Sequence, residues 1–149
     1  MKKYFILIIL LLFSCNGNTK ETTMKFVQTD NAPKAVGPYS QAVWANDTLS
    51  ISGQIPIDPA TQELKLFDGN VVEQTKLVLS NVKGVLESQG LTVENVVKAG
   101  VFIKDMNDFG AVNDVYASFF GNHKPARACV EVARLPKDVQ IEIEVIAVK

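Results

Sequence analysis

Hydrophobic residues along the chain fall into short alternating runs and two longer helical repeats, which together predict six strands and two helices. The short runs predict strands over residues 24–27, 41–45, 48–52, 96–103, 127–133 and 139–148. Spacings of three and four residues predict helices over residues 70–89 and 109–120. The dipeptide Asn46-Asp47 separates the second and third strands and is typical of a tight hairpin turn.

The first helix has one continuous apolar face and residues suited to both of its ends. Asp68 or Asn70 can cap its start, and Gly90 can close its end in a left-handed conformation. For the second helix, Asp108 is the candidate cap and Gly121 the candidate terminator. The residues expected to face the core from the first helix are Val71, Val78, Leu79, Val82, Val85 and Leu86.

This order of elements predicts an α+β fold in which one sheet carries two helices on a single face. The strands contain apolar residues at both alternating sets of positions, notably in residues 101–103, 130–132 and 146–148. Two helices cover only one face of such a sheet. The uncovered apolar face therefore predicts that the protein associates with further copies of itself.

The first 23 residues have a different pattern, in which a basic start is followed by ten apolar residues, 4–13, and then by polar ones. Ten apolar residues are too few to span a bilayer, which takes about 20, and the pattern is typical of a secretory signal peptide. The sequence Leu12-Phe13-Ser14-Cys15 resembles a lipobox, which implies a lipid on Cys15 and cleavage before it. An ordinary cleaved signal and a short uncleaved anchor are the alternatives.

We therefore expect a lipoprotein-type signal peptide over residues 1–15, a flexible tether over 16–23 and one domain over 24–149. The lipid would anchor an exported protein to a bacterial membrane, on the periplasmic side or at the cell surface. The chain has two cysteines, so lipidation of Cys15 leaves Cys129 without a partner inside the chain. The fold must then hold without a disulfide.

Composition supports a single globular domain and argues against a nucleic-acid partner. Hydrophobic residues make up 47% of the 149 residues and charged residues 21%, a balance typical of a domain with a packed core. The 15 basic and 16 acidic residues give a net charge of -1. A nucleic-acid-binding domain is expected to be strongly basic, with its lysines and arginines clustered.

The last two predicted strands carry the side chains best suited to chemistry. Alternation places Arg127, Cys129 and Glu131 on one face of their strand, and Glu142 and Glu144 on one face of theirs. A hairpin of these two strands would bring a guanidinium, a thiol and carboxylates together. An arginine can bind a carboxylate through two hydrogen bonds, and a carboxylate can hold a water. A structural ion pair between the strands is the alternative.

Four separated blocks in this order resemble the RidA/YjgF family. They are GPYSQA at residues 37–42, ISGQIP at 51–56, ARACVEVARLPKD at 126–138 and IEIE at 141–144. The resemblance extends over most of the chain from Phe26 onward. It implies a chorismate-mutase-like α+β unit that assembles as a homotrimer, with sites in the clefts between subunits.

The resemblance also implies an activity, the hydrolysis of 2-aminoacrylate and related enamines or imines to 2-oxo acids and ammonia. No metal and no organic cofactor is implied. Arg127 matches the family's ligand for the substrate carboxylate, and Glu142 matches the residue that holds the attacking water, assisted by the main-chain carbonyl of Cys129. Positions that line the family's pocket are matched by Tyr39, Gly53 and Asn113.

Each of these residues has a plainer structural interpretation. Arg127 could pair with Glu142 or Glu131, Glu142 could be a solvated edge residue, Tyr39 could pack, Asn113 could be a surface amide, and Gly53 could serve backbone geometry. The Cys129 thiol is not expected to be a nucleophile, because no base is evident near it. The only histidine, His123, lies in a short loop and is expected to be solvated.

The chain also departs from the family pattern. The loop over residues 121–125 is shorter than in many relatives, and Ala128 stands where a hydroxyl residue is frequent. The expected export separates the domain from the usual cytoplasmic substrates. A non-catalytic module that binds a small carboxylate at the membrane surface through Arg127 is therefore the main alternative, and a chaperone-like or ribonuclease role is a third.

Overall fold

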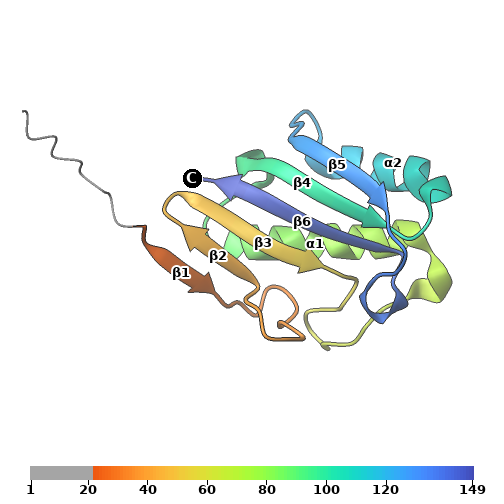
Figure 1. Cartoon of the computed structure of the whole chain (residues 1–149), viewed down its shortest axis with the longest axis horizontal. Helices are drawn as coiled ribbons and strands as arrows, with labels where there is room; N and C mark the ends of the chain where they lie inside the picture. Colours follow the sequence, from red (N-terminus) through yellow and green to blue (C-terminus); the bar gives the residue numbers. More distant parts are fainter. Residues whose placement is uncertain (1–21) are drawn as a thin grey trace, which may run out of the picture.

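The computed structural model of the chain describes residues 22–149. It contains one mixed six-stranded sheet and two α-helices, both of which lie behind the sheet in Figure 1. The strands are β1 (Met24–Val27), β2 (Ala42–Ala45), β3 (Thr48–Gln54), β4 (Val96–Ile103), β5 (Ala126–Glu131) and β6 (Ile141–Val148). The helices are α1 (Val71–Ser88) and α2 (Phe109–Phe120), with 3-10 turns at Phe67–Gly69, Val93–Asn95, Met106–Asp108 and Pro136–Asp138. The predicted α+β class, with two helices on one face, is confirmed.

The strand order β1-β2-β3-β6-β4-β5 differs from the expected arrangement at its C-terminal end. β5 runs parallel to β4, and β6 lies antiparallel between β3 and β4. The predicted hairpin of the last two strands is therefore wrong. The physical reason is that α2 carries the chain back across the sheet, as a parallel pair requires, and leaves β5 at the edge beside β4.

A side-chain cap marks the start of α1, and a glycine in a left-handed conformation follows its end. The Asn70 side chain accepts hydrogen bonds from the amides of Val72 (3.0 Å) and Glu73 (3.3 Å), so Asn70 and not Asp68 caps α1. Gly90 has the predicted left-handed conformation, with φ of 72°. The cap expected at Asp108 is wrong, because its side chain makes no capping bond.

The start of the second helical segment is shifted toward the N-terminus by a 3-10 turn. Asp105 caps this turn by accepting a hydrogen bond from the amide of Asn107 at 2.8 Å. The turn leads directly into α2, so α2 needs no side-chain cap of its own. Gly121, with φ of 58°, follows the last residue of the helix as expected.

The core lies between α1 and the covered face of the sheet. All six residues predicted for the apolar face of α1 are buried. Alternate residues of the central strand β6 face them, namely Ile141, Ile143, Val145 and Ala147. Complete burial of an aliphatic side chain of this size stabilises the fold by about 1.5–3 kcal/mol, so this layer is a main source of stability.

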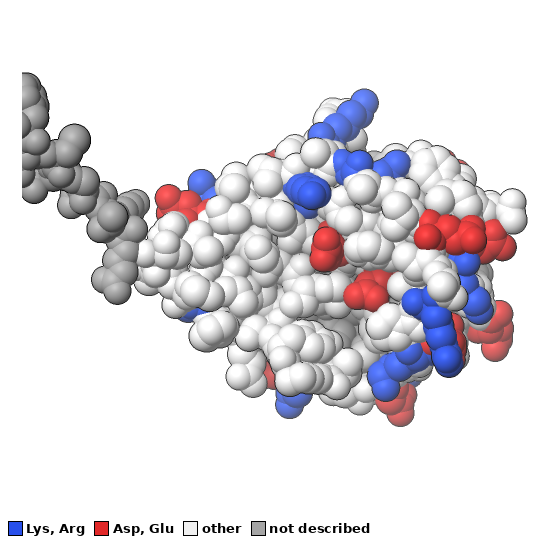
Figure 2. Space-filling view, in the orientation of Figure 1, with Lys and Arg blue, Asp and Glu red and all other residues white. Residues whose placement is uncertain are grey.

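The other face of the sheet is open and largely uncharged, with acidic atoms near its centre (Figure 2). Large apolar side chains are exposed on its strands, including Phe26 (66% exposed), Met24 (59%) and Val130 (43%). A surface of this kind favours contact with another protein surface. Self-association through this face remains a prediction.

Several predictions concern residues outside the described part of the chain. The signal peptide that ends at Cys15 lies wholly outside it, and so does most of the tether over 16–23. Among residues 22–149, neither helix has the length and apolar character needed to cross a membrane.

Candidate functional site

The carboxylates predicted to do chemistry lie in a cavity of about 480 Å³ on the open face of the sheet. We call it the acidic pocket. Glu142 and Glu144 contribute from β6, and no lysine, arginine or histidine lines the pocket. Its other lining residues include Val36, Tyr39, Gly53 and Pro136. Two of the predicted substrate-binding positions, Tyr39 and Gly53, therefore line the same cavity as Glu142.

Gly53 gives the Glu142 side chain room to lie against β3. A Cβ atom at position 53 would overlap Oε1 of Glu142 and lie 2.8 Å from its Cδ. Gly100 on β4 has the same relation to Glu144, since a Cβ there would lie 2.9 Å from Cγ and from Oε1. The side chains of two neighbouring carboxylates are therefore accommodated by two glycines, one on each adjacent strand.

The surroundings of Glu142 raise the pKa of its carboxyl group above the usual value for a glutamate in water. Its side chain is half-buried, and this burial raises the pKa of the carboxyl group; the negative charge of Glu144 raises it further. A carboxylate with a raised pKa is a better proton acceptor at neutral pH than an ordinary glutamate. Glu142 is thus suited to hold and polarise a water.

Tyr39 is positioned by a loop that a buried glutamine holds in place. The side-chain amide of Gln41 donates to the main-chain carbonyls of Thr29 (2.9 Å), Ala32 (3.2 Å) and Pro33 (2.7 Å). Its carbonyl oxygen accepts from the amide of Thr29 at 2.7 Å. Sequence reasoning did not single out Gln41, although it lies two residues from Tyr39.

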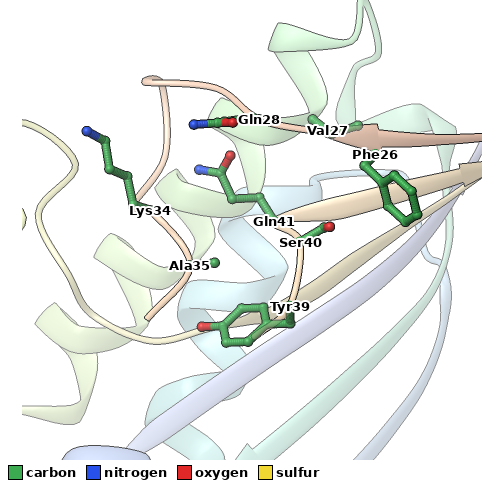
Figure 3. Close-up of a pocket in the computed structure, with 8 residues that line it drawn as sticks. All are labelled: Phe26, Val27, Gln28, Lys34, Ala35, Tyr39, Ser40 and Gln41. Carbon is green, nitrogen blue, oxygen red and sulfur yellow. The ribbon is translucent and has the colours of Figure 1, made fainter. Parts of the chain in front are cut away.

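The same loop borders a second cavity of about 430 Å³. Figure 3 shows Lys34 and Phe26 at opposite ends of this cavity, with Tyr39 and Ser40 between them. The Tyr39 hydroxyl accepts a hydrogen bond from the amide of Val36 at 3.2 Å, and the side chain is 47% exposed. Tyr39 therefore borders both cavities.

The predicted carboxylate ligand lies on the opposite face of the sheet. Arg127 lines a cavity of about 380 Å³ between β5 and α2, which we call the basic pocket. Its guanidinium carbon lies 4.6 Å from the ring centre of Tyr116 and 5.7 Å from that of Phe109, both on α2. Such stacking orients the planar group and leaves its N–H donors free. Further lining residues are Asn113, Phe120, His123 and Lys124.

Arg127 forms no ion pair within residues 22–149, so the interpretation of Arg127 as part of an ion pair inside one chain is wrong. Within residues 22–149, no carboxylate lies within salt-bridge distance of Arg127; the ion pairs present involve Lys65, Lys76, Lys83 and Arg134. Glu131 instead accepts a hydrogen bond from the amide of Met106 at 2.7 Å. Asn113 lines the basic pocket, apart from Tyr39 and Gly53, which line the acidic one.

Strand pairing shows why Arg127 and Glu142 are separated. Phe102 on β4 is the direct partner of both Glu142 and Val130, so these three side chains share the open face. Arg127 lies three residues before Val130 and therefore points to the helix-covered face. The expected meeting of guanidinium, thiol and carboxylates within one chain is wrong, because β5 and β6 are not neighbours.

Cys129 shares the face of Arg127 and packs partly against the core. Burial raises the pKa of its thiol, although the positive charge of Arg127 opposes this effect.

The only histidine, His123, connects its loop to β4. Its Nε2 atom lies 2.6 Å from the carbonyl oxygen of Val96. The expectation that His123 is solvated is wrong: it is half-buried and ties its loop to the sheet.

Two buried amides on α1 hold the backbone next to β3 and β6, and sequence reasoning gave neither of them a role. Asn81 donates to the carbonyls of Ile55 (3.3 Å) and Ile57 (2.9 Å), just after β3. Gln74 accepts from the amide of Gln140 at 2.8 Å, just before β6. Polar residues on the buried side of an amphipathic helix were the available signal. In residues 22–149, no group of three His, Cys, Asp or Glu side chains is arranged to hold a metal ion.

Known proteins resemble this chain over nearly the whole described region. A family model described as endoribonuclease L-PSP matches residues 29–149. A RutC family protein of Pyrococcus horikoshii is 56% identical over 121 residues, which cover 81% of this chain and 94% of the relative. The 2-iminobutanoate/2-iminopropanoate deaminase of Escherichia coli K12 is 51% identical over 128 residues, which cover 84% and 98%.

The fold is shared with solved structures of the same group. The crystal structure of E. coli TdcF with bound serine has 47% sequence identity and a TM-score of 0.78, over 84% of this chain and 98% of that one. Sequence identity of 56% and 51% to two relatives, together with the match to the family model, shows the family to which the chain belongs. The chain belongs to the RidA/YjgF family, which the endoribonuclease L-PSP model describes.

Proposed function

We propose that the protein hydrolyses 2-imino acids and their enamine forms, such as 2-aminoacrylate, to 2-oxo acids and ammonia. The observation that carries this proposal is the pair of oppositely charged pockets, one with an arginine free of carboxylates and one with a half-buried glutamate. The E. coli relative named for imine deamination supports the same activity.

The proposed site lies between two copies of the chain. Arg127 and Glu142 point to opposite faces of one sheet, so one copy cannot place both around one small molecule. A second copy that covers the open face can bring its Arg127 to the first copy's Glu142. The homotrimer implied by the family resemblance, a closed cyclic assembly, provides three such sites.

In this site, one copy positions the substrate and the other positions the water. Arg127 binds the substrate carboxylate through two hydrogen bonds, and Asn113 lines the same pocket. Glu142 of the other copy holds a water, which the main-chain carbonyl of Cys129 helps to orient. Tyr39 and Gly53 border this water, and positioning of both reactants provides much of the rate enhancement.

The chemical steps need only this water and proton transfers. An enamine such as 2-aminoacrylate first becomes the imine by moving a proton from its nitrogen to its terminal carbon. The water oxygen adds to the carbon of the C=N bond, and Glu142 passes a proton from the water to the nitrogen. After water has added, Glu142 transfers the hydroxyl proton of the carbinolamine to the nitrogen, the C–N bond breaks as the C=O bond forms, and ammonia leaves. The raised pKa of Glu142 suits a group that both accepts and returns a proton.

Cleavage of RNA, which the family description suggests, is less compatible with the surface. The open face carries Glu142 and Glu144 near its centre, and these charges would repel a phosphate backbone. The net charge of the chain is -1. We therefore favour the deaminase.

The proposal is tested by ammonia release from 2-imino acids that an amino-acid oxidase generates in place. The protein is expected to accelerate ammonia release, and Arg127→Ala is expected to abolish the acceleration while leaving the fold intact by circular dichroism. Equal rates with and without the protein, for every imino acid offered, would contradict the proposal.

We also propose that the mature protein is exported and carries a lipid on Cys15. The proposal rests on the residues around Cys15 alone. Mass spectrometry of the protein from the membrane fraction is expected to find an N-terminal Cys15 with a diacylglycerol, and Cys15→Ser is expected to lose both lipid and cleavage. An unmodified Cys15 in the native protein would contradict it.

A further inference from the structure

Two positively charged side chains, Lys124 and Arg127, line the basic pocket, and no aspartate or glutamate does. Asp114 is close in sequence to Asn113 but lines a separate groove between the two helices, together with Lys76. Lys124 forms no ion pair within residues 22–149.

The loop that carries Lys124 is held in place at several points. The amide of Gly121 donates to the carbonyl of Ala117 at 2.9 Å, and that of His123 donates to Phe120 at 3.0 Å. The His123 ring then ties the loop to Val96 on β4. A proline at position 125 further restricts the backbone of Lys124. The Lys124 side chain therefore starts from a defined point at the rim of the basic pocket.

We infer that the basic pocket binds two anionic groups of one substrate, so that the preferred substrates are 2-imino acids with an acidic side chain. The inference rests on the proposed function, in which Arg127 binds the carboxylate next to the imine. Lys124 then binds the second carboxylate. The cavity of about 380 Å³ lies within the usual range for small-molecule sites, so it has room for such a dicarboxylate.

The test compares two imino acids that differ in their side-chain charge. 2-Iminoglutarate and 2-iminobutanoate are generated in place by amino-acid oxidases, and kcat/KM is measured for the native protein, for Lys124→Gln and for Lys76→Gln. Lys124→Gln is expected to lower kcat/KM for 2-iminoglutarate by about fivefold, as for a partly exposed ion pair. Its effect on 2-iminobutanoate, which has no second carboxylate, should be smaller, so the ratio of the two kcat/KM values should fall. Lys76→Gln removes a lysine outside the pocket and should affect neither substrate.

A native protein that prefers 2-iminobutanoate, or a Lys124→Gln variant that slows both substrates equally, would overturn the inference. Binding of the stable 2-oxo acids, followed by calorimetry, separates this failure from failure of the deaminase proposal. If the protein turns over no imino acid but binds 2-oxoglutarate more tightly than 2-oxobutanoate, with a Lys124-dependent difference, only the reaction is wrong. Equal binding of the two acids, or binding of neither, would overturn the inference.

Discussion

Replacing Gly53 by alanine tests the position of the Glu142 carboxylate without removing the carboxylate. The added Cβ atom would lie 2.8 Å from Cδ and 3.1 Å from Cγ of Glu142, and it would overlap Oε1. Ordinary contacts of this kind begin at 3.4 Å. The Cδ atom must therefore move by about 0.6 Å and Oε1 by more than that, because the β3 backbone is held in the sheet.

This displacement is expected to affect catalysis far more than stability. A misplacement of about 1 Å in a reacting group lowers rates by about 100-fold, so we expect kcat of Gly53→Ala to fall by about 30- to 100-fold. An alanine in a strand restricts the unfolded chain more than a glycine does, which offsets part of the strain. We therefore expect the free energy of unfolding to change by less than about 1 kcal/mol.

The assay is ammonia release from 2-iminobutanoate, with urea denaturation of the same preparations. Gly100→Ala is the control, because its Cβ would lie 2.9 Å from Glu144, a milder conflict, and would leave Glu142 in place. We expect this control to keep kcat within about threefold of the native value. A Gly53→Ala variant as active as the control would refute the argument that the fixed position of Glu142 is needed.

Two further predictions concern residues around the acidic pocket. The charge of Glu144 helps to raise the pKa of Glu142, so Glu144→Gln should lower that pKa. If ionised Glu142 is required, the acidic limb of the pH profile of kcat/KM should move to lower pH, and an unchanged or upward-shifted limb would count against the coupling. Asn81→Ala removes the side-chain amide that donates to the Ile55 and Ile57 carbonyls, so the free energy of unfolding should fall by about 1–3 kcal/mol. Thermal unfolding measures this change, and an unchanged melting temperature would contradict the prediction.

The helix α1 and its two ends could be predicted from the sequence, because residues close together in the chain determine them. The apolar repeat of α1, its Asn70 cap and the glycine at position 90 act within a few residues of one another. The alternation of β6 likewise determines that Glu142 and Glu144 share a face. Each of these features was predicted correctly to within a few residues.

The order of strands and the partners of polar side chains could not be predicted in this way. The turn at residues 134–138 has good local chemistry, including an Arg134–Asp138 ion pair, but it does not join neighbouring strands. Strand pairing depends on contacts between residues far apart in sequence. The same holds for the loop residue His123, whose partner Val96 lies 27 residues away at the start of β4.

The separation of Arg127 and Glu142 leads to a direct test of the central claim. Arg127→Ala and Glu142→Gln are each expected to be inactive alone. If each site takes Arg127 from one copy and Glu142 from another, co-expression of the two variants in equal amounts should restore about one quarter of native ammonia release, because one interface in four then carries both intact residues. No recovery in co-purified mixed oligomers would contradict a site shared between copies.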